Sequence, residues 1–500
     1  METESLLPKS KSKKFRGRKY VSLIIIIIII TFIWLYYLTL RIEAGGRHIA
    51  TNRQYSRSGT EGWCLPGKPQ GEEGASDHGA KTNRAKTNMC REKGSSQALS
   101  VSLKEQVAFM AVNGKKTLLL SAYMEHRKQR QVHVISIVLR SEDQNYHCSI
   151  CCNEKLYFSK GVGDINRDHF DFSYGTADIM CPLPKGCETP SHIAVTNNAT
   201  SSGTEDLHEL VYLEVKNQNK SDALPYDFTV CISTMFNFTN VLQLVQSLEM
   251  VQLLGVDRVA IYKSDCSPET QRVLDYYTKK GLVEVIPWTI SNHLKPSRGW
   301  LPMHGPGDIH YFGQIPALTD CVYRYMYQSR YVSLQDIDEV ILPQSVNSWS
   351  DLLPQLEKKY GVDKCYMFEN NVFPNNVMLP LPASLKQPME SPGWKNVPGV
   401  NILAHLHHEP IIKETHYSNF KLIVNPRAVF RPTVHGLLKS EKGCAWVDRN
   451  IARMYHTRAA IQKLKPDQLI YDGRLLKYSD RLLSAVNTVL NETGLLPSEV

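Results

Sequence analysis

Short apolar runs alternate with segments of helical periodicity from residue 225 onward, and this alternation constrains the fold more than any other feature. Buried strands are expected at DFTVCIS (227–233), VAIY (259–262), LVEVI (282–286) and from Tyr331. Helices are expected over residues 241–251, from Ser267-Pro268-Glu269 to Gly281, and over 314–328. Strands that alternate with helices predict an α/β domain with a mostly parallel sheet and right-handed crossovers.

The last of these strands runs into two aspartates within residues 329–343, SRYVSLQDIDEVILP. Asp336 and Asp338 follow the expected strand end, and open α/β sheets bind ligands in the crevice beyond the carboxyl ends of their strands. Two carboxylates at that place suit a hard divalent cation and leave coordination positions for phosphate oxygens. Acidic pairs are common in turns, so Asp-x-Asp alone is a weak signal. The sequence has no G-x-G-x-x-G or G-x-x-x-x-G-K-[ST] motif, which argues against dinucleotide oxidoreductases and P-loop enzymes.

The N-terminal region predicts a membrane anchor. Val21–Leu40 is an uncharged, mostly apolar run that is long enough, at about 1.5 Å per helical residue, to cross a bilayer. Seven basic residues and two glutamates precede it, so residues 1–20 are expected to stay in the cytosol and the rest to be lumenal. A cleaved signal peptide would have a shorter apolar region. Residues 41–98, rich in Gly, Ser, Thr, Asn, Lys and Arg, are expected to be a solvated stem.

Cysteines and glycosylation sequons agree with a secretory compartment. The chain has 12 cysteines, an even number, which in a lumenal protein are expected to form disulfides. Acceptor sequons occur at Asn198, Asn219, Asn237 and Asn491. Most of the net charge of +9 lies in the cytosolic tail, so nucleic-acid binding is not predicted.

Residues 99–224 are expected to form a β-rich module stapled by disulfides and packed on the main domain. Two β-like runs occupy 117–140, and short strands with Pro/Gly turns follow around Cys148, Cys151 and Cys152. A zinc site at Cys148-x-x-Cys151 is the alternative, although no second cysteine pair has the spacing that zinc sites show. Residues 225–460 are predicted to form the catalytic domain, and residues 461–500 a helical C-terminal extension.

Three ordered motifs resemble a known family. They are GQIPALTDCVYRYMYQSRYVSLQDIDEVILP (313–343), KLIVNPRAVFRPTVHG (421–436) and MYHTR (454–458). Together they resemble glycosyltransferase family 92, and SAYMEHR (121–127) is similar to the segment that opens the family's homology region. The resemblance covers roughly residues 115–460.

The resemblance implies a type II Golgi membrane enzyme with an A-type, Rossmann-like glycosyltransferase fold. It also implies an inverting β-1,4-galactosyltransferase that uses UDP-galactose and Mn²⁺ and acts on glycans of glycoproteins. The donor epimer, the acceptor and the oligomeric state, with a homodimer as one option, are left open.

The implied chemistry assigns roles to individual residues. Asp336 and Asp338 are expected to hold Mn²⁺ against the donor's phosphates, with His435 as a third ligand and His456 as the second choice for it. An inverting reaction needs a base, and the candidates are Glu369, Glu409 and Glu414. Tyr262 and Asp265 are candidates for contacting a uridine, or are simply a turn residue and its neighbour. Gln314 and Asp320 either orient the carboxylates or only cap and solvate their helix, and His405 with His407 is a weak candidate zinc pair.

Other functional classes remain open at this stage. The runner-up within the class is a transferase of another UDP-sugar. A membrane-tethered carbohydrate-binding protein without turnover would keep the fold and bind glycans without releasing UDP. A nucleotide-sugar hydrolase would release UDP without any acceptor.

Overall fold

A computed structural model describes Cys90 and residues 109–197, 210–221, 223–380, 391–414, 417 and 419–496, all of which belong to one compact unit, Asp77–Val500. The predicted cytosolic tail, anchor and most of the stem lie outside these residues. Among the helices that the structure describes, none has the length and apolar character needed to span a membrane.

The second half of the chain forms a mixed sheet of nine strands in the order β11-β10-β9-β12-β16-β14-β20-β13, with β19 beside β14. Its strands are β9 (Tyr226–Met235), β10 (Arg258–Lys263), β11 (Val283–Pro287), β12 (Ser329–Gln335), β13 (Glu339–Pro343), β14 (Cys365–Pro374), β16 (Phe420–Val424), β19 (Cys444–Trp446) and β20 (Ala452–Arg458).

The prediction of a mostly parallel sheet holds for half of this sheet. Strands β11, β10, β9 and β12 are parallel neighbours, as the strand–helix alternation predicts. Beyond β12 the order becomes mixed, because β16 is antiparallel to both β12 and β14, and β13 is antiparallel to β20. Helix α6 (Trp349–Tyr360) connects β13 to β14, but these two strands are not neighbours in the sheet. In their described residues, the connections from β14 to β16 and from β16 to β20 contain no α-helix, so they do not impose a parallel direction on the strands.

The helices are α3 (Val241–Leu253), α4 (Pro268–Lys279), α5 (Gln314–Arg324), α6 (Trp349–Tyr360) and α7 (Ser479–Glu492). The helices α3 and α4 follow the sequence pattern, whereas α5 ends four residues before the predicted residue 328. In the extension predicted to be helical, residues 461–500, the described part has one α-helix, α7. The start of α4 shows why the local prediction succeeds: the Ser267 side chain accepts a hydrogen bond from the Thr270 amide, and Pro268 needs no partner for its missing N–H. Short pairs complete the fold: β15 (His407–His408) with β21 (Ile470–Tyr471), and β17 (Val429–Thr433) with β18 (Gly436–Ser440).

The first half forms the predicted β-rich module. Its strands are β1 (Met110–Ala111), β2 (Thr117–Glu125), β3 (Gln131–Leu139), β4 (Asn145–Cys152), β5 (Lys155–Ile165), β6 (Tyr174–Pro182), β7 (Pro190–Asn197) and β8 (Leu213–Lys216). Because β8 pairs with β2 as well as with β7, the sheet closes on itself.

Disulfides staple this module, as predicted. Cys148 is bonded to Cys181, Cys151 to Cys90, and Cys152 to Cys187. The alternative zinc site at Cys148-x-x-Cys151 is therefore excluded, because both of its thiolates are used. A fourth disulfide, Cys231–Cys321, ties β9 to α5 in the second half.

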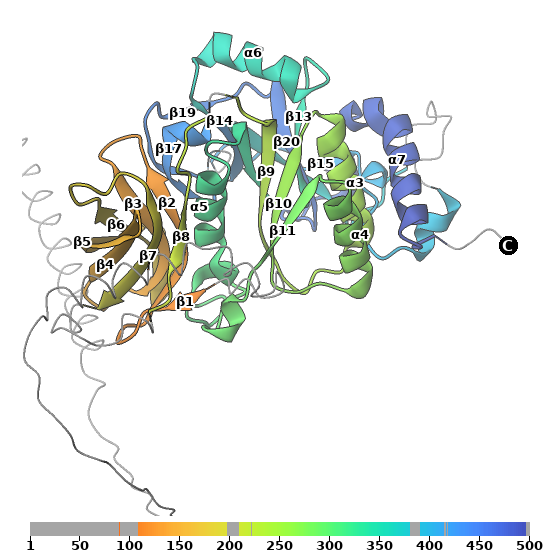
Figure 1. The fold of residues 1–500 in the computed structure, drawn as a ribbon. Helices are drawn as coiled ribbons and strands as arrows, with labels where there is room; N and C mark the ends of the chain where they lie inside the picture. Colours follow the sequence, from red (N-terminus) through yellow and green to blue (C-terminus); the bar gives the residue numbers. More distant parts are fainter. Residues whose placement is uncertain are drawn as a thin grey trace, which may run out of the picture. The chain divides into compact units, whose positions relative to one another are not determined.

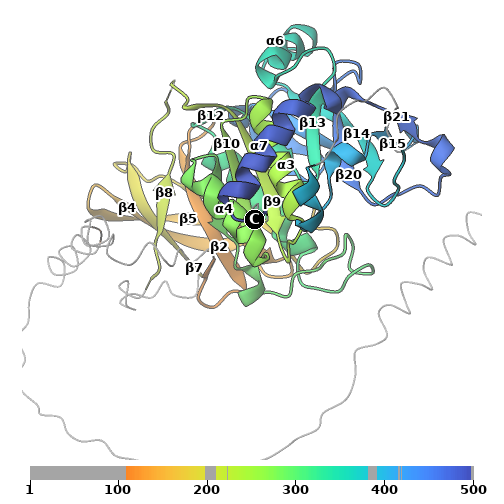
Figure 2. The ribbon, with the colours of Figure 1, turned by 90° about the vertical axis from the view of Figure 1, so that its right-hand side faces the viewer.

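Helix α5 lies between the two sheets (Figure 1). It contacts β9 on one side and β2 and β3 on the other, and one buried cluster includes Tyr123 and Ile135 of the first sheet together with Val322 of α5. Helices α3 and α4 cover the opposite face of the second sheet, and α7 packs on α3 (Figure 2). The residues of α7 that are buried in the main core are Leu482, Val486, Val489 and Leu490.

Candidate active site

A cavity of about 540 Å³ opens beyond the carboxyl ends of β9 and β12. The last residues of β9 form one wall, and the turn after β12 forms the floor. The remaining walls come from the segment before α5, from the β17–β18 turn and from the end of β20. Its polar lining residues are Ser233, Thr234, Asn240, Gln243, Gln314, Asp336, Asp338, Glu339, Asn375, Asn419, His435, His456, Thr457 and Arg458.

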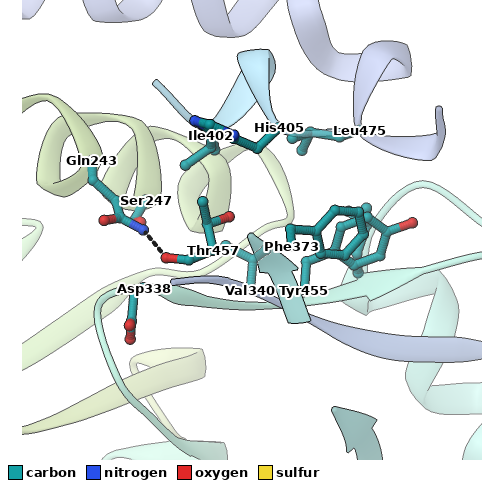
Figure 3. A pocket seen from close by; sticks show the side chains of 11 residues that line it. Gln243, Ser247, Asp338, Val340, Phe373, Ile402, His405, Tyr455, Thr457 and Leu475 are labelled. Atoms are coloured by element: carbon teal, nitrogen blue, oxygen red, sulfur yellow. Dashed lines mark hydrogen bonds between the residues drawn. The ribbon is translucent and has the colours of Figure 1, made fainter. Parts of the chain in front are cut away.

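The Asp-x-Asp turn joins β12 to β13, as the sequence predicts. The Thr457 amide donates to the main-chain oxygen of Asp338 (3.0 Å), and Gln243 of α3 donates to the main-chain oxygen of Thr457 (3.0 Å). A second cavity of only about 10 Å³ lies behind the turn, and the Asp338 side chain points away from it (Figure 3). The turn is therefore held from behind, while the Asp338 carboxylate, 37% exposed, faces the large cavity.

Lys421 of β16 is the principal partner of Asp336. Its ammonium lies 2.7 Å from Asp336 Oδ2 and 3.3 Å from Glu339 Oε2, and its side chain is only 3% exposed. The other oxygen of Asp336 accepts from Ser233 Oγ (3.2 Å) and Gln314 Nε2 (3.3 Å). Burial disfavours the charged carboxylate, but Lys421 outweighs it and holds the pKa of Asp336 below its usual value.

Glu339 and His456 complete this buried group of charges. Glu339 accepts from the Asp336 amide (2.8 Å), and burial raises its pKa despite Lys421. His456 of β20 lies 3.2 Å from Asp338 Oδ2 and 3.4 Å from Glu339 Oε1. Burial opposes protonation of His456, but Glu339 and Asp338 outweigh it and raise its pKa. The cavity floor thus places the Lys421 ammonium and the His456 ring between carboxylates.

His435 lies in the turn of the β17–β18 hairpin and lines the cavity. Its Nδ1 lies 3.1 Å from the main-chain oxygen of Phe420, so Nδ1 carries the proton and Nε2 keeps its lone pair. Burial and the Lys421 ammonium lower the pKa of His435 to about 4, so the ring is neutral at pH 7. The hairpin is anchored on the first sheet, because Arg431 contacts Asp178 (2.5 Å) and Asp164 (2.6 Å).

The predicted metal set Asp336, Asp338 and His435 is only partly suited to a divalent cation. Across the described ranges, no three His, Cys, Asp or Glu side chains are arranged to hold a metal ion. Asp336 is the member that does not fit, because its two oxygens are already engaged and one of them faces an ammonium. Asp338 and His435 both line the cavity, and they offer a carboxylate oxygen and a neutral ring nitrogen, which are donor types that Mn²⁺ accepts. The weak candidate pair His405 and His407 is likewise not part of any such group.

Tyr262 does not line the cavity. Its side chain is completely buried, its hydroxyl donates to Asp320 (2.6 Å), and its ring meets Trp288 edge-on. A ring with no free face cannot stack on a nucleobase in this arrangement, which corrects the interpretation of Tyr262 as a uridine contact. Asp265 is exposed beside the cavity but is not part of its lining.

None of the three candidate bases lines the cavity, and Glu414 is exposed on the surface. Glu369 stands within β14 and not at its end, because that strand continues to Pro374, and its nearest cation is Arg449 (3.5 Å). Glu409 is 2% exposed, and its carboxylate accepts from the amides of Ile461 and Gln462 (2.8 and 3.0 Å). It fixes the segment after β20. Neither carboxylate can reach an acceptor hydroxyl in the cavity without a rearrangement.

Three consecutive residues before α5 have a left-handed backbone. Tyr311, Phe312 and Gly313 have φ values of 32°, 54° and 71°. Such values are costly for Tyr and Phe and persist where the surroundings enforce them. Here the Trp288 indole donates to the Phe312 oxygen (2.7 Å), and the turn delivers Gln314 to Ser233 and Asp336. Gln314 therefore orients a carboxylate, one of the two roles considered from the sequence.

Sequence reasoning missed Lys421 and Trp300. Lys421 is the one charge in the apolar strand FKLIV, and a lysine inside such a strand is a signal of a buried ion pair. Trp300 lines the cavity from the loop between β11 and α5, where the pattern gives only a loop.

Three of the four predicted glycosylation sites are exposed: Asn219, Asn237 and Asn491. Asn198 lies outside the described residues. The Asn237 amide lies within hydrogen-bond distance of Asp265 Oδ2 (3.1 Å) and Arg298 (2.6 Å), next to the cavity residues Phe236 and Phe238.

Comparisons with known proteins agree with the sequence resemblance. A family model described as glycosyltransferase family 92 matches residues 226–489, more than half of the chain. A curated relative from Caenorhabditis elegans, beta-1,4-galactosyltransferase galt-1, is 22% identical over 45% of this chain and 50% of its own length. A second, glycosyltransferase family 92 protein F13G3.3 of the same organism, is 27% identical over 25% of each chain. The chain thus spans half or less of the curated relatives that it matches.

Among solved structures, glucosyl-3-phosphoglycerate synthase from Mycobacterium tuberculosis with Mn²⁺, UDP and glucosyl-3-phosphoglycerate matches 55% of this chain and 82% of that chain. The identity is 11% and the TM-score 0.22. A mycobacterial protein matches similarly, with a TM-score of 0.23 over 76% of its length. Scores this low do not establish a shared fold.

Proposed function

The chain belongs to glycosyltransferase family 92, and from this premise we propose that it transfers galactose from UDP-galactose to a terminal sugar of glycoprotein glycans. A β-1,4 linkage is the form that the name of the C. elegans relative supports. The observation that carries the proposal is the Asp-x-Asp turn at the end of β12, whose carboxylates face a cavity of about 540 Å³. Transfer to β linkage from an α-linked donor inverts the anomeric carbon.

An A-type glycosyltransferase fold is part of the same proposal. It is supported by the four parallel strands β11, β10, β9 and β12, which are joined by helices, and by the cavity beyond the carboxyl ends of β9 and β12. The second half of the sheet is mixed, so the proposal rests on the parallel half. A Golgi location with a single N-terminal anchor is supported by residues 21–40 and by the four disulfides.

The floor of the cavity supplies the charges that a departing nucleotide needs. Lys421 keeps Asp336 ionised and fixed, and Asp336 in turn is held by Ser233 and Gln314. Asp338 and Nε2 of His435 would hold the Mn²⁺ that the resemblance implies. When bound, such a cation would offset the negative charge on the nucleotide's phosphates. A neutral His435 is the form that can bind a metal, and its lowered pKa keeps it so.

Purified full-length protein incubated with UDP-galactose, Mn²⁺ and galactose- or N-acetylglucosamine-terminated glycans tests the proposal. We expect a product heavier by one hexose and one UDP released per transfer. Asp338→Asn should lower the rate by at least about 100-fold, because the cavity loses a charge aimed at the phosphates. The exposed Asp467→Asn is the matched control and should change nothing.

Three results would favour the alternatives to this proposal. UDP release that is undiminished without acceptor indicates a hydrolase. Glycan binding that survives Asp338→Asn, with no UDP release by the unmodified protein, indicates a carbohydrate-binding protein. Transfer from a different UDP-sugar in place of UDP-galactose would correct the donor only.

A further inference from the structure

Trp300 is the aromatic residue at the mouth of the cavity. Among the described lining residues, only Trp300, Arg458 and Ala459 are exposed, and Trp300 is 37% exposed. Its neighbours are three other rings: Phe170 at 5.0 Å, His310 at 4.7 Å and His435 at 5.5 Å between centroids. The rings of Phe170 and His310 make T-shaped contacts with the indole, and these contacts restrict its movement.

The loop that carries Trp300 is built to hold it in place. A Cβ on Gly299 would lie 2.5 Å from the Gly305 nitrogen, and a Cβ on Gly305 would lie 2.6 Å from the Gly299 nitrogen. The two glycines therefore cross in direct backbone contact and close the loop 299–305. Ser297, fully buried, donates to the Gly305 oxygen (2.6 Å) and accepts from the Gly299 amide (2.9 Å). The indole does not sit on a loose loop, so contact with it costs little ordering entropy.

The support behind Trp300 is apolar in character. His310 is 3% exposed, and neither of its ring nitrogens has a hydrogen-bond partner within the described part of the chain. It stacks on Phe170 at 4.2 Å. Phe170 belongs to the first half of the chain, so the β-rich module packs against this wall of the cavity through Trp300.

We propose that Trp300 is the stacking surface for the terminal pyranose ring of the acceptor glycan. A pyranose has an apolar C–H face and hydroxyl groups at its edge, and a fixed indole beside polar side chains matches both. The acceptor is the ligand that fits this position, because a glycan on a protein must enter from the mouth. The donor phosphates are directed to Asp338 at the floor. Asn375, Asn419 and Arg458 supply hydrogen-bonding groups around the same opening.

This inference rests on the proposed function, and its test has a readout that does not need turnover. Saturation-transfer NMR of the full-length protein with galactose- and N-acetylglucosamine-terminated oligosaccharides should show contact with the C–H face of the terminal ring. Trp300→Ala should weaken this binding, and raise the acceptor KM, by at least about tenfold, a loss of about 1.4 kcal/mol. Trp300→Phe should retain most of the binding, and the KM for UDP-galactose should be unchanged in both variants.

Met303, 82% exposed on the same loop, provides the matched control, and Met303→Ala should behave as the unmodified protein. Unchanged acceptor binding in a folded Trp300→Ala variant overturns the assignment. A raised KM for UDP-galactose with an unchanged acceptor KM also overturns it, by placing the donor on the indole. If no UDP-sugar is turned over but Trp300→Ala still loses oligosaccharide binding, the proposed function fails and the stacking surface stands.

A second, independent observation concerns Cys365 and Cys444. They are register partners on the parallel strands β14 and β19, and the Cys365 amide donates to the Gly443 oxygen (3.1 Å). Neither is in a disulfide in the structure, whereas four other pairs are oxidised. Aligned residues on adjacent strands have Cα atoms about 4.8 Å apart, within the Cα–Cα range that a disulfide spans. The two thiols also interact with each other.

The geometry points to a fifth disulfide, Cys365–Cys444, in the protein that forms the other four. Two thiols would be oxidised to one disulfide with loss of two protons, and the two electrons would reduce a disulfide of a thiol–disulfide oxidoreductase to two thiols. The bond would close residues 365–444 into a loop that contains both Lys421 and His435.

Thiol alkylation of the folded full-length protein, followed by proteolysis without reductant and mass spectrometry, tests this bond. We expect the peptides containing Cys365 and Cys444 to be joined and unalkylated, and Cys444→Ser to free Cys365 for alkylation after unfolding. Recovery of both peptides as separate alkylated species, alongside the intact Cys231–Cys321 peptide pair, would refute the bond.

Discussion

Lys421 is a buried cation between two carboxylates, and it keeps Asp336 ionised at the floor of the cavity. Its ammonium contacts Asp336 at 2.7 Å and Glu339 at 3.3 Å. Burial opposes its charge, but the two carboxylates outweigh burial and raise its pKa above the usual value. Lys421 is therefore charged at neutral pH and holds Asp336 in place.

Replacing Lys421 by methionine should destabilise the protein by about 3–5 kcal/mol, because two buried carboxylates lose their counter-charge. The midpoint of urea unfolding measures this change. The double variant Lys421→Met with Asp336→Asn should recover part of the lost stability. The second substitution removes one of the two carboxylates that Lys421→Met leaves without a counter-charge. If Lys421→Met unfolds at the unmodified midpoint, the ion pair contributes nothing to stability.

Glu249 offers a test of pH dependence outside the cavity. It lies on α3, is 8% exposed and accepts from the Tyr277 hydroxyl of α4 (2.6 Å). Burial raises its pKa above the usual value, although Tyr277 opposes this. The folded protein therefore keeps a proton that the unfolded chain has already lost. The free energy of unfolding should fall as the pH rises from the ordinary glutamate pKa through this raised value.

Glu249→Gln should remove that loss, because the amide stays neutral and still accepts from Tyr277. The variant should gain on the order of 1 kcal/mol at pH 7. The gain should vanish near pH 4, where Glu249 is protonated in both states. Urea unfolding at a series of pH values measures both limits, and a gain that is constant with pH would contradict the assignment.

At the scale of elements, α5 is held to its neighbours through one carboxylate. Asp320 is fully buried and accepts from Ser121 (2.5 Å) and Tyr123 (2.7 Å) of β2 and from Tyr262 (2.6 Å) of β10. Burial disfavours its charge, but Arg324 and the surrounding donors hold the pKa of Asp320 at about 2. Asp320 is thus a junction of both sheets and the helix that presents Gln314.

Asp320→Asn should lower the free energy of unfolding by about 2–4 kcal/mol, because an amide cannot accept from all of these donors and Arg324 keeps, among the described residues, only its contact with Glu284 (3.3 Å). Hydrogen exchange should speed up in β2 (Thr117–Glu125) more than in β20 (Ala452–Arg458). Equal acceleration in both strands would mean that the junction has no local role.

The same elements show what can be predicted from the sequence. The strands and helices from residue 226 to 343 follow their apolar patterns because burial on a sheet or helix face is a local property. The surroundings of Glu369 show a limit of such patterns: the polar Asn370 and Asn371 break the apolar pattern, yet their backbone continues β14 and pairs with β20. Tyr262 is a second example. Its hydroxyl donates to Asp320, which is distant in sequence, so this contact cannot be predicted from the local pattern.

At the scale of the whole molecule, the two halves of the described chain form one unit. The sequence places a boundary near residue 224, but α5 packs against both sheets, and one buried cluster includes residues from each. The position of Asp336 and Asp338 in the cavity was predictable because they follow a strand. Trp300 and Lys421 were not, because their positions depend on how distant segments meet.

Removal of residues 1–216 should therefore prevent folding, because the apolar side of α5 would be exposed and Asp320 would lose its partners on β2. Both halves of the full-length protein should unfold in one cooperative transition. Circular dichroism and intrinsic fluorescence, recorded during urea unfolding, measure this. Two separate transitions, or a folded and monomeric fragment starting at residue 217, would show that the halves are independent.

The hairpin that carries His435 reaches across to the first sheet, where Arg431 contacts Asp178 and Asp164. Homologous recombination near residue 220 would join one parent's arginine to another parent's aspartates. Hybrid genes made at that crossover point should give working proteins only when the donated segment brings matching acidic residues. Substitutions at Arg431 and at these two aspartates should therefore be correlated during evolution.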